Sequence, residues 1–166
     1  DFNAGAGAYI EREISEDYLQ QLNDDVSLAR NFNVVVDAGN GVAGPIAIKM
    51  LEALGCTVSA LYCNPDGNFP NHDPDPTKAE NLEDLLSDVA ISGADVGIAF
   101  DGDGDRVVIV TNSTKIIPSD KLLMLFAKEL LATQPGADIL FDVKCSRDLV
   151  TVIPSNGGRP VMTKSG

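Results

Sequence analysis

One hexapeptide in the chain, Asp101-Gly102-Asp103-Gly104-Asp105-Arg106, combines residue types that point directly to chemistry. Its three carboxylates alternate with glycines and would repel one another unless a cation joined them. The glycines permit a tight backbone curl that could bring the side chains to one point. Oxygen ligands of this kind suit Mg²⁺ or Ca²⁺ rather than a soft metal. The sequence therefore predicts a divalent-metal site at Asp101, Asp103 and Asp105.

Arg106 adds a permanent positive charge beside this site and suits an anionic ligand such as a phosphate. Carboxylate ligands that leave coordination positions open to water or a phosphate oxygen are usual for Mg²⁺ in phosphoryl chemistry. An EF-hand loop is excluded, because its sixth position would be Gly and its twelfth Glu, where this chain has Arg106 and Asn112. A solvated turn without metal is the remaining, less favoured alternative.

The segment Gly39–Gly44 matches G-x-G-x-x-G between a predicted strand and a predicted helix. A dinucleotide site would also need an acidic residue at the end of the second strand, where the chain has Leu61-Tyr62-Cys63-Asn64. We interpret the segment as a tight, closely packed turn, with a nucleotide-dependent oxidoreductase as the alternative function. The single histidine, His72, receives no role.

Lys144 and Arg147 follow another predicted strand, and α/β sheets bind ligands beyond the carboxyl ends of their strands. A charged helix start explains these two cations equally well on spacing alone.

Hydrophobic patterning places these residues in an α/β framework. Predicted strands cover 33–37, 57–62, 95–100 and 107–111, and predicted helices begin at Ser15, cover 43–54 and follow a capping box at Thr77–Glu80. The segment 64–77 holds four prolines and breaks the pattern, and loops of this length are usually functional or disordered. The βαβαβ order predicts a mostly parallel sheet covered by helices.

A second unit is expected from residue 113 to 166, opening with Ile116 and Ile117 as a strand. The predicted fold class is therefore α/β, with two three-layer α/β/α units that have mixed, mostly parallel sheets. The second unit is predicted to be truncated. The predicted division is a linker or domain end at 1–13, a domain at 14–112 that carries the aspartate loop, and the incomplete unit at 113–166.

Composition narrows the classes of partner. The net charge of −13 argues against nucleic acid and against an anionic membrane surface as partners. The sequence contains no run of about 18 apolar residues, the length that a membrane-spanning helix needs. The three cysteines form no CxxC pair, which favours buried thiols in a reducing compartment, so we expect a cytoplasmic protein.

Taken together, these residues resemble the α-D-phosphohexomutase family. The resemblance rests on 37–41, 66–70, 72–76, 80–82, 101–106 and 142–147. It implies a four-domain enzyme of which this chain holds the end of the first domain, the second, and the opening of the third.

The resemblance also implies an activity. The family interconverts hexose 1-phosphates and 6-phosphates (mannose, glucose or both) through a phosphoserine and a bisphosphorylated sugar. It implies that Asp101, Asp103 and Asp105 hold Mg²⁺, that Arg106 lies at the transferring phosphoryl group, and that Lys144 and Arg147 contact the phosphosugar.

The chain departs from the family pattern because it has no Thr-Ala-Ser-His-Asn-type nucleophile loop and no sugar-recognition loop. We therefore expect this isolated piece to be inactive and to need the remaining domains as partners. A Ca²⁺-stabilised, non-enzymatic binding module is the other alternative.

Overall fold

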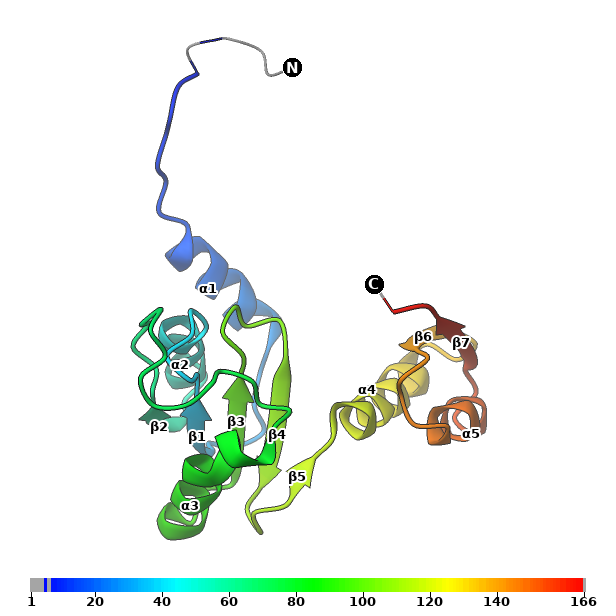
Figure 1. Cartoon of the computed structure of the whole chain (residues 1–166). Helices are drawn as coiled ribbons and strands as arrows, with labels where there is room; N and C mark the ends of the chain where they lie inside the picture. Colours follow the sequence, from blue (N-terminus) through cyan, green and yellow to red (C-terminus); the bar gives the residue numbers. More distant parts are fainter. Residues whose placement is uncertain (1–4, 6, 166) are drawn as a thin grey trace.

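The computed structural model describes residue 5 and residues 7–165, which form two separate sheets with helices packed against them (Figure 1). The elements are α1 Ser15–Asp25, β1 Asn33–Asp37, α2 Gly44–Ala53, β2 Thr57–Leu61, η1 Ala79–Leu82, α3 Glu83–Ser92, β3 Val96–Phe100, β4 Val107–Thr111, β5 Ile116–Ile117, α4 Ser119–Thr133, β6 Asp138–Asp142, α5 Asp148–Ser155 and β7 Arg159–Thr163. The predicted linker at 1–13 includes residues 1–4 and 6, which lie outside the described residues. Residues 7–14 are exposed and carry no helix or strand.

The first sheet has five strands in the order β2-β1-β3-β4-β5. β1 pairs in parallel with β2 and β3, whereas β3–β4 and β4–β5 are antiparallel. This confirms the prediction of a mixed sheet in an α/β fold. The direction changes at β3, because the chain returns directly along β4 through the aspartate loop instead of crossing over a helix.

Helices cover both faces of this sheet, which gives the first unit its three layers (Figure 1). On one face Leu85 and Val89 of α3 pack against Val35, and on the other Ala47 and Leu51 of α2 pack in the cluster that holds Val34 and Val36. The inner strand β1 is buried on both faces, as its run of β-branched residues predicts. Burial of each such large aliphatic side chain stabilises the fold by about 1.5–3 kcal/mol.

The prediction that Ile116 and Ile117 open the second unit is wrong. These residues form β5, which pairs with β4 at the edge of the first sheet. Their strand character is correct, but strand pairing depends on how the turn at 112–115 folds, with Thr114 at φ 59°, and the hydrophobic pattern does not report that.

The second unit consists of the parallel pair β6–β7 with α4 and α5. Both helices pack on one face of the pair, where they bury Ile139 and Phe141 with Leu149 and Ile153. Leu140 points to the opposite face and is 60% exposed. The third layer predicted for this unit is therefore absent from the described residues.

The predicted capping box at Thr77–Glu80 is also wrong. Thr77 donates its hydroxyl to Asp75 Oδ1 at 2.7 Å instead of capping a helix, and the short 3₁₀ helix η1 precedes α3. Over the described part of the chain, no helix has the length and apolar character needed to cross a membrane.

The close approach of α2 to the end of β2 gives a test of the packing. A Cβ added at Gly44 would lie 2.5 Å from the carbonyl oxygen of Cys63, a backbone atom that cannot rotate away. Gly44→Ala should therefore lower the free energy of unfolding by about 1–3 kcal/mol, although Ala is the better helix former.

Gly67→Ala is the matched control, because a Cβ at Gly67 meets no heavy atom within 4 Å. Urea denaturation of the two variants should show the loss only for Gly44→Ala. An equal effect of both substitutions would contradict the close contact.

Candidate metal centre

The aspartate loop, residues 101–106, joins β3 to β4 and closes on itself through Asp101 and Arg106. The Arg106 backbone N–H donates to Asp101 Oδ1 at 2.9 Å, and the Asp101 N–H donates to the Arg106 carbonyl at 3.3 Å. Gly104 has φ +77°, a conformation that favours glycine, and its N–H donates to the Asp101 carbonyl at 3.2 Å. The glycine spacing thus produces the tight curl that the sequence predicts.

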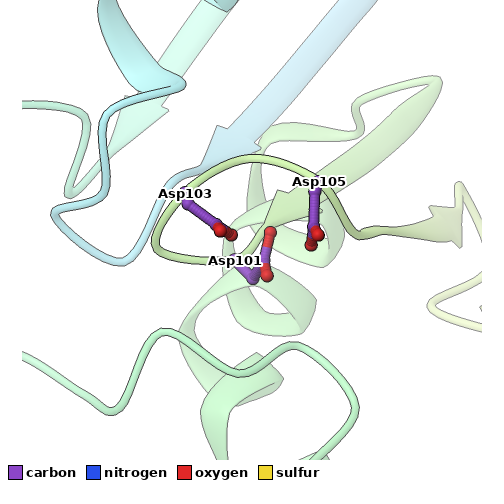
Figure 2. Close-up of side chains that lie close together, drawn as sticks. All are labelled: Asp101, Asp103 and Asp105. Atoms are coloured by element: carbon purple, nitrogen blue, oxygen red, sulfur yellow. The ribbon is translucent and has the colours of Figure 1, made fainter. Parts of the chain in front are cut away.

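The three carboxylates of the loop converge on one point (Figure 2). One oxygen from each of Asp101, Asp103 and Asp105 lies within 4.8 Å of the other two. Asp101 is buried and only 1% exposed, whereas Asp103 and Asp105 are exposed. Asp101 therefore forms the buried side of the cluster, and Asp103 and Asp105 form an open side that faces solvent.

Charge repulsion is visible in the ionisation of the cluster. The nearby charge of Asp103, followed by the hydrogen bond with Asp101 and its charge, raises the pKa of Asp105. Burial opposes the ionisation of Asp101, but hydrogen bonds from the Arg106 backbone and side chain outweigh it, so the pKa of Asp101 is lowered. Arg106 therefore compensates mainly for Asp101. Its Nε also lies 3.7 Å from Asp105 Oδ1, but this charge only partly offsets the repulsion from Asp103 and Asp101, so the pKa of Asp105 stays raised.

These properties fit a hard divalent cation. Converging carboxylate oxygens are the ligands that Mg²⁺ and Ca²⁺ prefer, and a cation here would remove the repulsion that raises the pKa of Asp105. The open side leaves room for an anionic ligand. The sequence prediction for the metal ligands agrees with this geometry, and their role as ligands stays a prediction.

The glycine-rich turn at 39–44 packs directly against the aspartate loop. The Val42 N–H donates to the Gly102 carbonyl at 3.1 Å, and a Cβ at Gly41 would lie 2.7 Å from that same oxygen. These contacts support the interpretation of this segment as a closely packed turn.

Arg106 contacts carboxylates on two different loops. Its Nε donates to Asp101 Oδ2 at 2.7 Å, and its Nη1 donates to Asp75 Oδ1 at 3.0 Å. A cavity of about 320 Å³ opens beside Arg106 toward α4 and is lined by Asp105, Val107, Ser119, Leu122, Leu123 and Phe126. Arg106 therefore lines a space that could hold part of a ligand.

Lys144 and Arg147 lie in the loop that follows β6, and both are exposed. The Lys144 N–H donates to Asp142 Oδ1 at 2.6 Å, and the Ser146 N–H donates to Asp120 Oδ2 at 3.0 Å. The loop is thus fixed at two points at the carboxyl end of β6, where the sequence places it. The structure records no contact between these cations and the aspartate loop.

Sequence reasoning missed two parts of the site, Asp75 and the pair Asp37–His72. His72 Nε2 lies 3.1 Å from Asp37 Oδ2, and its Nδ1 lies 2.9 Å from the Asp73 carbonyl. Burial raises the pKa of Asp37 in spite of the Gly39 N–H and His72 that face it. The only signals available in the sequence were the length of the segment 64–77 and the aspartate that directly follows the three valines of β1.

Comparison with known proteins identifies relatives of the chain. Residues 16–114 match the family described as "Phosphoglucomutase/phosphomannomutase, alpha/beta/alpha domain II". A "Phosphomannomutase/phosphoglucomutase" of Pseudomonas aeruginosa is 56% identical over 166 residues, which cover 100% of this chain and 36% of that protein. A "Phosphoglucomutase" of Neisseria meningitidis serogroup B is 45% identical over 160 residues, covering 96% of this chain and 35% of that protein.

A solved structure agrees with these sequence relatives. The crystal structure of a phosphoglucomutase/phosphomannomutase family protein from Burkholderia thailandensis superimposes with a TM-score of 0.96 at 47% identity, covering 99% of this chain and 36% of that one. The chain thus spans about a third of the length of the relatives it matches.

The carboxylate cluster predicts a metal-dependent gain in stability. A cation that binds only the folded state stabilises it by about 2.7 kcal/mol at 100 times its dissociation constant. Mg²⁺ should therefore raise the melting temperature of the chain, and Asp103→Asn should abolish most of that rise. Glu83→Gln, which removes one charge from α3, is the matched control and should keep it. An undiminished rise in Asp103→Asn would contradict a site at the cluster.

The same cluster predicts that the free energy of unfolding depends on pH when a chelator keeps the chain free of metal. Because the pKa of Asp105 is raised above its ordinary value of 3.8, its contribution to stability is present below that value and is lost as pH rises through the raised pKa. Asp103→Asn removes the largest cause of the shift, so it should reduce this loss. Urea denaturation from pH 3 to neutrality measures it, and an identical pH profile for variant and parent would contradict the assigned repulsion.

Proposed function

Because the chain belongs to the phosphoglucomutase/phosphomannomutase family, we propose that it is part of a phosphosugar mutase. The whole protein would move a phosphoryl group between the 1- and 6-positions of a hexose (mannose, glucose or both). The observation that carries the proposal is the cluster of three carboxylates within 4.8 Å beside an arginine that carboxylates hold in place. Phosphoryl transfer depends on positioning and on compensation of negative charge, which this set of groups can supply.

The metal in this proposal is Mg²⁺, held by Asp101, Asp103 and Asp105. When bound, it supplies positive charge against the negative charge of the phosphoryl group in transfer. The chain's own residues would set the position of the metal. Arg106 holds the buried Asp101 in place, and Asp103 and Asp105 lie on the solvent-facing side of the cluster.

Arg106 is the proposed catalytic residue of this chain. The guanidinium is positively charged at any physiological pH, and its hydrogen bond to Asp101 raises its pKa further. Its N–H groups that point away from Asp101 and Asp75 can donate to oxygens of the phosphoryl group, and these bonds strengthen as charge builds up in transfer.

Lys144 and Arg147 are the proposed contacts of the phosphosugar. Their position beyond the carboxyl end of β6, in a loop that hydrogen bonds to Asp142 and Asp120 hold in place, supports this role.

The proposed boundary between the two domains moves to the connection after β5, because that strand belongs to the first sheet.

The nucleophilic serine and the sugar-recognition loop would come from segments that this chain does not include, which agrees with its covering 36% of the Pseudomonas relative. We place the enzyme in the cytoplasm, where its free thiols Cys56, Cys63 and Cys145 would stay reduced. The remaining domains of the enzyme are its proposed partners.

A coupled assay with hexose 1-phosphate tests the proposal. The whole protein should turn over only with Mg²⁺, and Arg106→Lys should lower kcat about 100-fold, the typical cost of losing one aligned donor to a transition state. Arg159→Lys, at an exposed ion pair with Asp138, is the matched control and should leave kcat unchanged.

Two results would contradict the proposal. The first is no Mg²⁺-dependent turnover by the whole protein. The second is turnover that survives Arg106→Lys at the level of the control. The isolated chain should show no turnover in the same assay, since it lacks the serine.

A further inference from the structure

The proline-rich loop 64–77 lies directly against the aspartate loop. A Cβ at Gly102 would lie 3.3 Å from Pro74 and 3.7 Å from Phe69, so the two loops are in van der Waals contact. Asp75, one residue beyond Pro74, reaches across to Arg106. The loop that broke the helix and strand pattern is therefore part of the wall of the site.

Asp75 and Asp101 hold Arg106 from two loops that are far apart in sequence. Asp101 accepts from Nε at 2.7 Å and Asp75 accepts from Nη1 at 3.0 Å. Hydrogen bonds from two different nitrogens thus restrict the orientation of the guanidinium plane. The Arg106 side chain is 52% exposed, and a long exposed side chain with only one contact would keep much of its rotamer freedom. Two of its five N–H groups are used, which leaves three to donate outward.

Asp75 is itself built into its loop. Its Oδ1 accepts from the Thr77 hydroxyl at 2.7 Å and from the Thr77 N–H at 3.2 Å. Its backbone carbonyl accepts from Asn81 Nδ2 at 2.9 Å. The hydrogen bonds from Thr77 lower the pKa of Asp75, followed by the charges of Arg106 and Lys78, so this carboxylate is ionised near neutral pH.

The pair His72–Asp37 anchors the same loop to the sheet. Asp37, at the end of β1, is 1% exposed and faces His72 Nε2, while His72 Nδ1 faces the Asp73 carbonyl. A Cβ at Gly39 would lie 3.1 Å from the His72 ring and from Pro74, so the loop is packed tightly there. Both ring nitrogens are engaged and the His72 side chain is only 16% exposed, which assigns it to anchoring rather than to contact with a ligand.

We propose that Asp75 is a positioning residue that aims the Arg106 guanidinium at the phosphoryl group, from a loop anchored by His72 on Asp37. The role in phosphoryl transfer rests on the proposed mutase function. The orientation of Arg106 does not, and it is measurable in the absence of any activity.

Asp75→Ala in the whole protein tests the proposal through kinetics. A misaimed donor lowers the rate of the chemical step, so kcat should fall about 10-fold to 100-fold while KM changes little. Asp75→Asn, which keeps an acceptor oxygen, should recover part of the loss. Asp73→Ala is the matched control: it removes a carboxylate from the same loop, and this side chain pairs with Lys78 at 2.5 Å, not with Arg106. It should behave as the parent does.

A double-mutant cycle separates positioning from general damage to the fold. Because Asp75 is proposed to act only through Arg106, adding Asp75→Ala to Arg106→Lys should cost much less than it costs alone. Effects on kcat that multiply in full, or an Asp75→Ala variant as active as Asp73→Ala, would overturn the proposal.

The motion of the Arg106 side chain gives a readout that needs no turnover. The NMR signal of its Nη–H groups, assigned by its loss in Arg106→Lys, should report an ordered guanidinium in the parent and in Asp73→Ala, and one that rotates freely about its Nε–Cζ bond in Asp75→Ala. An equally ordered signal in Asp75→Ala would overturn the positioning role. If the parent protein shows no turnover, the mutase proposal fails, and this signal still decides the role of Asp75.

His72→Ala tests the anchor. It should lower kcat in the same direction as Asp75→Ala and add little in the Asp75→Ala background, because both act through the loop. A His72→Ala protein that melts at a lower temperature but keeps the kcat of the parent would overturn the anchoring role.

Discussion

The repulsion among the carboxylates of Asp101, Asp103 and Asp105, with oxygens within 4.8 Å of one another, is the constraint on which the rest of the site depends. A loop with this much negative charge is held together by covalent geometry and by Arg106, which compensates mainly for Asp101. The charge left on Asp103 and Asp105 is what makes the loop a receptor for a cation. The same repulsion lowers the stability of the metal-free loop and increases its affinity for a cation, a trade-off that is common at functional sites.

The fold supplies the rigidity that this arrangement requires. Asp101 follows β3, whose neighbour β1 is buried on both faces between α2 and α3. The reversal into β4 puts the aspartate loop at the carboxyl end of the parallel strands, which is where α/β sheets bind ligands. The turn at 39–44 supports the loop from below and the segment 64–77 supports it from the side, so the loop is enclosed by two segments that themselves follow strands. Lys144 has the equivalent place after β6 in the second sheet.

The sequence predicted the elements whose signal is local. β1 was found at 33–37 from its apolar β-branched run, and the aspartate loop was found from the spacing of its carboxylates and glycines. Contacts between distant segments were beyond its reach. The bond from Arg106 to Asp75 joins residues 31 apart, and that from His72 to Asp37 joins residues 35 apart, so neither leaves a periodic pattern in the chain. The pairing of β5 with β4 failed for a related reason: hydrophobicity marks a strand without naming its neighbour.

The location of a bound cation tests the central claim most directly. Crystals of the protein soaked in Mn²⁺, a close substitute for Mg²⁺ with measurable anomalous scattering, should show one strong anomalous peak at the open side of the aspartate loop. That peak should lie within coordinating distance, about 2.0–2.3 Å, of a carboxylate oxygen from each of Asp101, Asp103 and Asp105. Absence of a peak at saturating Mn²⁺, or a peak only at another place in the protein, would contradict the account.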